Sequence, residues 1–461
     1  MPRGGAPLTV VVLAAGQGTR LRSKTIKLLH PVAGRPMVVL VVETVRALDP
    51  SRIVAVVGFQ AERVREALAD QPCEFTLQRA QRGTGHAVRQ AASRIGPRST
   101  VLIVNGDLPL IRPATLRSLV ARHRRAGAAL SLLTTVVPDP TGYGRIVRDG
   151  RSRLERIVEH KDASPAELRI AEINAGIYCA EADKLMPALR RLRPDNAQRE
   201  YYLTDAIERL LDQGETVLAV CHPQSEEVLG VNTRQELAGA STALYARKAA
   251  ELQNQGVTLL DASRTWVDPR ARIGRDSLVY PDVIIEGATV IGADCVVRPG
   301  CRLVDCRIGP NVEIKDHSLL VDSRIGEGAR VGPFAHLRPG SVLGPRARVG
   351  NFVELKETTL GRGSKASHLS YLGDASIGAD CNVGAGTITC NYDGTRKHRT
   401  TLGRGAFIGS DVQLVAPVVV QAGAYVAAGT TVTEDVPAGA LAIGRGRQRN
   451  VAGWVKRRRS R

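Results

Sequence analysis

The sequence is poor in aromatic residues: Phe, Trp and Tyr make up 3% of its 461 residues. Modules that bind single-stranded nucleic acid stack bases on aromatic side chains, so this shortage disfavours that class. No apolar run approaches the ~18 residues of a membrane-spanning helix, and residues 1–7 lack the apolar core of a signal peptide. We therefore expect a cytoplasmic protein without a membrane or nucleic-acid partner.

The eight cysteines include no Cys-x-x-Cys pair, which argues against a zinc ribbon or a thioredoxin-type centre. Most lie in apolar stretches, which predicts reduced, buried thiols. Acidic residues are also in short supply, because 45 Asp and Glu face 64 Lys and Arg and give a formal charge of +19. The basic run at residues 456–461 supplies five of these charges. The remainder of the chain is therefore basic too, and attracts phosphorylated metabolites.

The first ~230 residues alternate short β-rich runs with helical patterns, as two or more domains of ordinary size allow. The runs at 9–13, 53–57 and 101–104 are short, apolar and β-branched, which predicts buried strands. Between the first two, apolar residues from Met37 to Leu48 recur at helical spacing after Pro36. This alternation predicts a Rossmann-like α/β domain with a mostly parallel sheet. Its ligands should bind beyond the strand ends at Leu13 and Val104.

Beyond about Val257 the pattern changes to a six-residue repeat. An aliphatic residue, commonly followed by Gly, returns every six positions, as at Ile273-Gly274 and Ile291-Gly292. This repeat is typical of a parallel β-helix, in which three hexapeptides form a coil of ~18 residues. Residues 273–440 therefore predict roughly nine coils. The repeat loses phase near residues 304–306, 364–371 and 388–399, where we expect loops to protrude.

Between the two patterns, Leu237, Ala240 and Leu244 recur at helical spacing before Gly256, which predicts a connecting helix. The predicted organisation is a first domain at residues 1–234, a helical linker at 235–255 and a β-helix domain with a basic tail at 256–461.

A glycine-rich loop follows the first predicted strand. Leu21 stands where a dinucleotide fingerprint needs its third Gly, and no Gly-Lys-Ser/Thr of a P-loop follows. Gly16 and Gly18 with Arg20, and then Lys27, still describe a backbone and cations that can approach phosphates closely. The sequence therefore predicts a phosphate site at this strand end.

A second polar segment follows the predicted strand at 101–104. Asn105-Gly106-Asp107 places a carboxylate at the strand's carboxyl end, and magnesium prefers one or two carboxylates together with substrate phosphates. Gln78 and the run 83–86 (GTGH) add a polar loop in which a nucleobase could be held.

The β-helix carries one histidine of interest, His368. A lone loop histidine is usually inert, but Lys356 precedes it and Asn391-Tyr392 follow it by about one coil. Residues ~18 apart stack on one wall of the prism, so we expect His368, Lys356 and Asn391 to converge. Acyl transfer from a thioester to an amine needs a base that works near neutral pH, and imidazole suits that task.

The run 13–20 (LAAGQGTR) followed by Lys27 resembles the signature of sugar-phosphate nucleotidyltransferases. The runs 83–86, 140–145 (PTGYGR), 157–162 (IVEHKD), 172–174 (EIN) and 230–232 (GVN), with the β-helix behind them, narrow the resemblance. Over nearly its whole length the chain is similar to the bifunctional N-acetylglucosamine-1-phosphate uridylyltransferase/glucosamine-1-phosphate N-acetyltransferase family.

This resemblance implies a left-handed β-helix and a homotrimer with acetyl sites between subunits. It implies acetyl transfer from acetyl-CoA to glucosamine-1-phosphate, and then magnesium-dependent uridylyl transfer from UTP that yields UDP-N-acetylglucosamine, a precursor of peptidoglycan and lipopolysaccharide. For the uridylyl site it implies that Arg20 and Lys27 neutralise phosphates and that Asp107 and Asn232 ligate magnesium. The nucleotide would be held by Leu13, Ala14, Ala15, Gly16, Gln78, Gly83, Thr84, Asn105 and Gly106, and the sugar by Gly144, Glu159 and Asn174. The sequence departs from the family at Ile26, where proline is usual.

For the acetyl site, the resemblance implies that His368 accepts the proton of the substrate amine, with Glu354 orienting it. The other implied residues are Arg338 and Lys356 for the sugar phosphate, Tyr371 and Asn382 for the sugar, and Asn391, Tyr392, Ala385, Ser410, Ala428 and Arg445 for acetyl-CoA. No acyl-enzyme is implied, because Cys381 and Cys390 lie at positions typical of the core.

Two alternatives remain open at this point. One is a single-activity sugar nucleotidyltransferase whose β-helix only assembles or regulates subunits, and the other is a non-enzymatic scaffold. His368 with Asn391-Tyr392 argues against the first, since a scaffold needs none of these polar groups. The presence of Arg20, Lys27 and Asp107 argues against the second.

Overall fold

The computed structural model describes residues 6–459 and divides into two compact units, one ending at Leu244 and the other beginning at Tyr245. Residues 1–5 of the N-terminal stretch and Arg461 of the basic run lie outside the described residues. Within the described part no helix is long and apolar enough to cross a membrane.

The first unit is built on a mixed nine-stranded sheet, whose main path runs β11-β7-β10-β6-β1-β4-β5. The three predicted buried strands are confirmed as β1 (Leu8–Ala14), β4 (Arg52–Val57) and β6 (Thr100–Asn105). β1 lies between the other two and runs parallel to both. β10 (Glu172–Glu181) runs antiparallel to β6, which makes the sheet mixed. The carboxyl ends of β1 and β6 therefore meet at one edge of the sheet.

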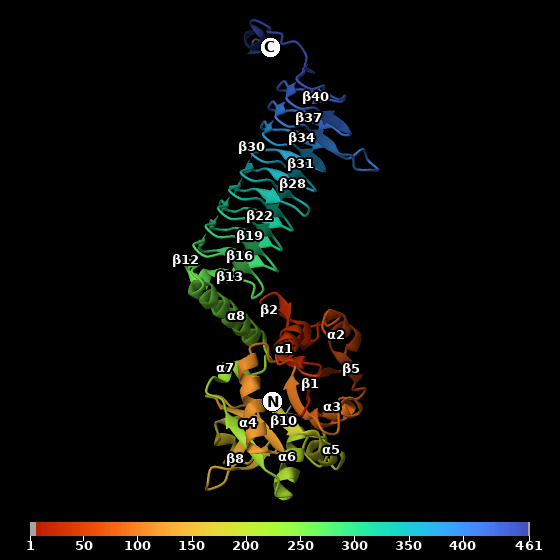
Figure 1. The fold of residues 1–461 in the computed structure, drawn as a ribbon, viewed down its shortest axis with the longest axis vertical. Coiled ribbons are helices and arrows are strands. Elements are labelled where there is room, and N and C mark those ends of the chain that lie inside the picture. Colours follow the sequence, from red (N-terminus) through yellow and green to blue (C-terminus); the bar gives the residue numbers. More distant parts are fainter. Residues whose placement is uncertain (1–5, 460–461) are drawn as a thin grey trace, which may run out of the picture. The chain divides into compact units, whose positions relative to one another are not determined.

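Helices cover both faces of this sheet (Figure 1). Val10 and Val12 of β1 pack with α1, α2 and α4 on one face, whereas Val11 packs with α3, α5 and α6 on the other. This alternation is the two-residue period of a strand that is buried on both sides. The helices are α1 (Met37–Arg46), α2 (Ala61–Ala67), α3 (Thr84–Gln90), α4 (Pro113–Ala126), α5 (Ala182–Arg190), α6 (Leu203–Asp212) and α7 (Ser225–Val228), and the remaining strands are β2 (Pro31–Val32), β3 (Arg35–Pro36), β5 (Glu74–Leu77), β7 (Leu130–Val136), β8 (Arg145–Arg148), β9 (Leu154–Val158) and β11 (Val217–Cys221).

The predicted connecting helix is α8 (Arg234–Asn254). A capping box fixes its start: Glu236 N donates to Thr233 Oγ1 over 3.1 Å, and Thr233 N donates to Glu236 Oε2 over 3.1 Å. Gly256 follows its end with φ +88°, a conformation that favours glycine. The start of α8 is therefore held rigidly next to Asn232.

The second unit is a β-helix of three parallel sheets, which we call walls I, II and III; its stacked coils are visible in green to blue in Figure 1. Each coil contributes one strand to each wall, and buried aliphatic residues such as Val279, Val297 and Ile314 stack in register inside the prism. The predicted left-handed β-helix with an α/β first domain is confirmed.

The strands of each wall are short. Wall I holds β12 (Thr258–Leu259), β15 (Leu278–Val279), β18 (Val296–Val297), β21 (Glu313–Ile314), β24 (Arg330–Val331), β27 (Arg348–Asn351), β30 (Lys365–His368), β33 (Asn382–Val383), β36 (Phe407–Ile408), β39 (Tyr425–Val426) and β41 (Leu441–Ala442). Wall II holds β13 (Thr265–Val267), β16 (Val283–Glu286), β19 (Arg302–Val304), β22 (Leu319–Val321), β25 (His336–Leu337), β28 (Glu354–Lys356), β31 (Tyr371–Gly373), β34 (Ile388–Cys390), β37 (Gln413–Val415) and β40 (Thr431–Val432). Wall III holds β14 (Arg272–Ile273), β17 (Val290–Ile291), β20 (Arg307–Ile308), β23 (Arg324–Ile325), β26 (Val342–Leu343), β29 (Thr359–Leu360), β32 (Ala375–Ile377), β35 (Thr400–Leu402) and β38 (Val418–Val420). A short helix, α9 (Trp454–Arg459), follows the last coil.

The extent and loops of the β-helix differ from the prediction. The first coil begins at Thr258 rather than at residue 273, because its strands lack the Ile-Gly pairs by which the repeat was recognised. The prediction of a loop at 304–306 is wrong. Buried Leu303 and Ile308 are five residues apart instead of six, so the corner between them is one residue shorter than the repeat. The loop at 364–371 is also wrong, since Ala366 continues the six-residue repeat as a small inward residue.

The loop expected at 388–399 is confirmed only for residues 391–399, because residues 388–390 form β34. There Ala375 pairs with Thr400, 25 residues later, whereas most neighbouring coils take 17 or 18 residues. The loop projects beside β34 in Figure 1.

Candidate active sites

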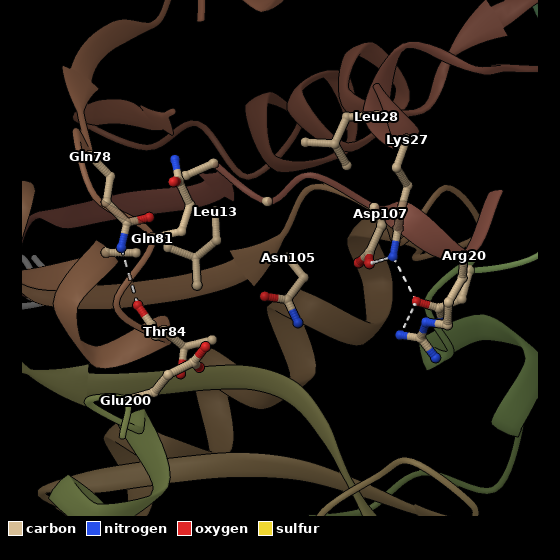
Figure 2. Close-up of a pocket in the computed structure, with 16 residues that line it drawn as sticks. Leu13, Arg20, Lys27, Leu28, Gln78, Gln81, Thr84, Asn105, Asp107 and Glu200 are labelled. Carbon is tan, nitrogen blue, oxygen red and sulfur yellow. Dashed lines mark hydrogen bonds and ion pairs between the residues drawn. The ribbon is translucent and has the colours of Figure 1, made fainter. Parts of the chain in front are cut away.

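A cavity of about 430 Å³ lies at the joint carboxyl ends of β1 and β6, where the sheet rule predicted a ligand site. Figure 2 shows its polar side chains, which come from five separate stretches of the first unit and turn toward a common space. The lining includes the predicted residues Leu13, Ala15, Gly16, Arg20, Lys27, Gln78, Gly83, Thr84, Asn105, Asp107 and Asn232, together with the unpredicted Gln81 and Glu200.

Cations and oxygen ligands meet at one end of this cavity. Lys27 Nζ forms an ion pair with Asp107 and donates to Asn232 Oδ1 over 2.7 Å. Arg20 NH2 donates to the same Asn232 oxygen over 2.8 Å, as the dashed lines in Figure 2 show. Both side chains predicted to ligate a metal are thus held by the two cations predicted to bind phosphates.

The donor set fits a hard divalent cation. Asp107 Oδ1 is buried and has no hydrogen-bond partner among the described residues, and an unpaired buried carboxylate oxygen is costly. Asn232 presents its amide oxygen toward the same point, where Lys27 now lies. One carboxylate and one amide oxygen beside a phosphate site are the ligands that Mg²⁺ prefers.

The end of the cavity at which a nucleobase was predicted to bind depends on a glycine. Gly83 has φ +99°, and a Cβ there would come within 2.6 Å of the Tyr201 carbonyl oxygen. Its own carbonyl accepts a hydrogen bond from Gln78 Nε2 over 3.2 Å. Because Gln78 is buried and held at both Gly83 and His86, its amide has a fixed orientation.

A second cavity of about 270 Å³ adjoins the first. It shares Arg20, Thr84, Asn105, Asp107 and Asn232 with the first cavity, and adds the predicted sugar residues Gly144, Glu159 and Asn174. The shared wall is the cluster of cations and oxygen ligands. A group bound in one cavity can therefore react across this cluster with a group bound in the other.

The sugar residues are fixed by contacts around Glu159. Glu159 Oε1 accepts from Thr204 Oγ1 over 3.2 Å, and a Cβ on Gly144 would come within 3.5 Å of the Glu159 carboxyl. Burial raises the pKa of Glu159 above its ordinary range. Asn174 N donates to the Gly144 carbonyl, and its side-chain amide donates to Tyr178 OH over 2.7 Å.

A neighbouring carboxyl gives a test of this acidic region. Burial, with Glu208 and Glu159 nearby, raises the pKa of Asp205 to about 6. A carboxyl whose folded-state pKa is raised stabilises the fold below its unfolded pKa, and this stability is lost as pH rises through the folded pKa. We expect Asp205→Asn to raise the melting temperature at pH 7.5 by about 1–3 °C, since solvent screens this half-buried group. The gain should shrink toward pH 5.

Asp212→Asn, an exposed change on the same helix, is the control and should show no such pH dependence. A gain in melting temperature for Asp205→Asn that is equal at both pH values would contradict the prediction.

Two predicted site residues, Ala14 and Gly106, differ from the others, and Ile26 is the position at which the sequence departs from the family. Ala14 is buried in the core and does not line either cavity. Gly106 donates its amide to the Leu13 carbonyl over 2.9 Å, so it holds the two strand ends together. Ile26 has φ −60°, the value that proline would impose. Ile26 therefore keeps, before Lys27, a backbone angle that proline could also adopt.

In the second unit, one group of predicted residues gathers on wall II. Arg338 forms an ion pair with Glu354 over 2.9 Å, and Tyr371 lies in register with Glu354 on the next strand. Lys356 Nζ lies 3.5 Å from Asp374, and Asn391 Nδ2 donates to the same carboxylate. The unpredicted Asp374 thus joins Lys356 to Asn391.

The loop at 391–399 adds a second ammonium to this group. A hydrogen bond with Lys397 raises the pKa of Lys356, whereas the same contact and the Lys356 charge lower the pKa of Lys397. Arg338 adds to the positive field on Lys397. Arg338, Lys356 and Lys397 thus bring three cations together at the surface, which is the charge that a predicted phosphate site requires. Sequence reasoning missed Lys397 because nothing in the sequence shows that the loop folds back on Lys356.

His368 lies elsewhere. It ends β30 on wall I, and its Nδ1 lies 2.6 Å from Asn351 Oδ1. The expected convergence of His368 with Lys356 and Asn391 on one wall is wrong, because twelve residues are two thirds of a coil and not a whole one. Asn351 was missed, although its spacing of 17 residues from His368 is one coil.

The predicted acetyl-CoA residues share one edge of the prism. Ala385, Ser410 and Ala428 each follow a strand of wall I by two residues. Arg445 NH1 donates to the Ala428 carbonyl over 2.6 Å, so its side chain lies on this edge. Asn382 is on the outer face of the same wall. Of the two cysteines, Cys381 is buried as expected, but the core position of Cys390 is wrong, since it is only half-buried at the end of β34.

Comparison with known proteins agrees with both units. The MobA-like NTP transferase domain matches residues 10–200, and the GMPPB C-terminal domain matches residues 262–360. The bifunctional protein GlmU of Pelobacter propionicus is 51% identical over 97% of this chain and 98% of its own length. That of Geobacillus thermodenitrificans is 50% identical over the same shares, and that of Alkalilimnicola ehrlichii is 48% identical over 97% and 96%. The chain belongs to the bifunctional GlmU family.

Membership of the GlmU family confirms the expected bifunctional enzyme of UDP-N-acetylglucosamine synthesis, with a uridylyltransferase and an acetyltransferase in one chain. Its substrates are small molecules, and its nucleotidyl transfer uses a divalent metal. The alternative of a single-activity nucleotidyltransferase is not favoured, since GlmU relatives match both units over nearly their full length.

Proposed function

We propose that the two reactions use separate sites, uridylyl transfer in the first unit and acetyl transfer on the β-helix. The observation that carries the first assignment is the wall shared by the two cavities, formed by Arg20, Asp107 and Asn232 among others. UTP would occupy the larger cavity, and N-acetylglucosamine-1-phosphate the smaller one. The proposed uridylyl site thus lies before residue 234, the predicted end of the first domain, and the proposed acetyl site lies after residue 256, the predicted start of the β-helix domain.

In uridylyl transfer the sugar-phosphate oxygen attacks the α-phosphorus of UTP, the bond to the β-phosphate breaks and pyrophosphate leaves. Gln78 and Gly83 orient the base, and Glu159 with Asn174 orients the sugar, so that the two phosphates meet at the shared wall. Asp107 and Asn232 would hold Mg²⁺, which neutralises phosphate charge when bound. Lys27 and Arg20, released from these oxygens, would neutralise the remaining charge.

In acetyl transfer the amine of glucosamine-1-phosphate attacks the thioester carbonyl, a C–N bond forms and the C–S bond breaks. Arg338, Lys356 and Lys397 would hold the sugar phosphate, and Tyr371 and Asn382 the sugar. When His368 Nδ1–H donates to Asn351 Oδ1, the ring's Nε2 is left free to accept the amine proton. That proton then passes to the departing thiolate of coenzyme A.

We infer a homotrimer, because one chain splits the acetyl site between two walls. The residues proposed to bind phosphate, Arg338 and Lys356, lie on wall II, whereas His368, Asn382 and the acetyl-CoA edge belong to wall I. The outer faces of adjacent walls diverge. A stacked ladder of His317, Phe334 and Phe352 also stands along one edge, with Phe334 and Phe352 about half exposed. Exposed aromatic ladders of this kind are typical of buried subunit contacts. A cytoplasmic location is proposed with this function.

The test is product analysis by mass spectrometry after incubation with glucosamine-1-phosphate, acetyl-CoA, UTP and Mg²⁺. We expect UDP-N-acetylglucosamine and pyrophosphate. With EDTA in place of Mg²⁺ the reaction should stop at N-acetylglucosamine-1-phosphate, because both proposed metal ligands, Asp107 and Asn232, lie in the first unit. Omission of acetyl-CoA should leave glucosamine-1-phosphate unacetylated. Complete conversion in EDTA would contradict the magnesium site, and the absence of any acetylated product would contradict the β-helix assignment.

A further inference from the structure

Four coils of the β-helix place an acidic residue at the corner where wall II passes to wall III. Asp305, Asp322, Glu357 and Asp374 each directly follow a wall II strand, with φ between +40° and +51°. Aspartate tolerates this left-handed backbone better than most residues, so a turn role alone accounts for an aspartate at the corner. The first three side chains are exposed, whereas that of Asp374 is only 20% exposed. Turn geometry does not explain this burial.

The Asp374 carboxylate is covered by two side chains that belong to different coils. Lys356 Nζ, at the end of β28, lies 3.5 Å from both carboxylate oxygens. Asn391 directly follows β34, and its Nδ2 donates to Asp374 Oδ2. Asn391 is itself 8% exposed. One carboxylate thus holds the ammonium proposed to bind the sugar phosphate and the amide proposed to contact acetyl-CoA.

The contact with Asp374 also decides which way the Asn391 amide faces. A carboxylate accepts hydrogen bonds and donates none, so it draws the amide nitrogen and turns the amide oxygen away. The neighbouring Gly373 leaves room for this arrangement, because a Cβ there would overlap the Tyr371 hydroxyl and come within 2.7 Å of Asn391 Nδ2. Tyr371 and Asn391 therefore lie together over the Gly373 backbone, beside the carboxylate.

The charge of Asp374 acts on both lysines of the proposed phosphate site. The contact between Lys356 and Lys397 has the largest effect on their pKa values, raising that of Lys356 and lowering that of Lys397, and the Asp374 charge raises both. Two ammonium groups in contact repel each other, and a carboxylate beside them offsets this repulsion. Without it, we expect Lys356 to turn away from Lys397 before substrate binds.

We propose that Asp374 is a positioning residue for acetyl transfer, which holds Lys356 toward the sugar phosphate and fixes the Asn391 amide toward the reacting groups. The inference rests on the proposed acetyl site of the β-helix. Asp374 acts through these two side chains and is not itself assigned a contact with substrate. Its two effects are separable, because the ion pair needs the charge whereas the bond from Asn391 needs only an acceptor oxygen.

The test compares two variants at saturating acetyl-CoA. Asp374→Asn keeps an acceptor for Asn391 but loses the charge, so KM for glucosamine-1-phosphate should rise about 2- to 10-fold, as for one partly buried ion pair, with kcat within about twofold of normal. Asp374→Ala also leaves the Asn391 amide without its acceptor, and kcat should fall roughly 5- to 50-fold in addition. Uridylyl transfer by the same preparations should be unchanged.

Asp322→Asn and Asp322→Ala are the matched controls, because Asp322 occupies the same corner with φ +40° and is exposed. Both should leave KM and kcat normal. A lower KM for glucosamine-1-phosphate in Asp374→Asn would overturn the proposal, since the carboxylate would then only compete with the phosphate. A normal kcat in Asp374→Ala, or an equal loss in Asp322→Ala, would overturn it in favour of a turn role.

Asp374→Asn keeps the shape of the side chain and suits the left-handed backbone, so its KM tests the proposal even where the alanine variant does not fold. Failure of the unmodified enzyme to acetylate glucosamine-1-phosphate would instead refute the proposed function itself.

Discussion

Asp107→Asn is expected to lower the turnover of uridylyl transfer by about 10²–10³-fold while acetyl transfer stays within about twofold of normal. The carboxylate supplies the only negative charge in the pair that would ligate Mg²⁺, and it also holds Lys27 by an ion pair. An amide of the same shape keeps the packing but loses the charge that binds the cation. Loss of one preorganised electrostatic contact at a phosphoryl centre has an effect of this size.

The measurement follows pyrophosphate release and acetylation in parallel on the same preparation. Asp70→Asn, an exposed carboxylate of the first unit, is the control and should leave both rates unchanged. Raising the Mg²⁺ concentration should partly restore the Asp107→Asn enzyme, because a weakened site fills at higher concentration. Loss of both activities in a folded protein would contradict two separate sites.

The first unit could be predicted from sequence because its signals are local. Buried strands are apolar and β-branched, and in such a sheet ligands bind at the strand ends, which placed Gly16 and Asp107 at one edge. The structure added what depends on distant contacts. Glu236 lies beside Asn232 only because the capping box of α8 folds the chain there, and its pattern, Thr233-x-x-Glu236, was present in the sequence but unused.

The β-helix was predictable in type but not in detail. Its inward positions tolerate a small residue such as Ala366, so a search for aliphatic-Gly pairs loses the repeat where the coil continues. One-residue shortenings such as Leu303 to Ile308 shift the sequence phase without moving a wall. The sequence phase alone therefore does not show on which wall a side chain lies. For this reason His368 was wrongly expected on the same wall as Lys356.

The largest expected effect on acetyl transfer comes from His368→Ala. We expect turnover to fall by roughly 10²–10⁴-fold, the usual contribution of one positioned acid–base group. His368 is exposed at the end of β30 and bonded to Asn351, so its removal leaves no cavity in the core. Uridylyl transfer should be unchanged, because its residues lie in the first unit. Binding of coenzyme A, measured by calorimetry, should also survive, since its proposed contacts are other residues.

Asn351 separates the role of the base from that of its orientation. Asn351→Leu removes the acceptor that fixes the imidazole, and should lower turnover only about 2- to 10-fold, as expected for one hydrogen bond. If His368→Ala keeps more than about a tenth of the normal turnover, the histidine is not the base, and a substrate amine that is already deprotonated at the working pH is the better account.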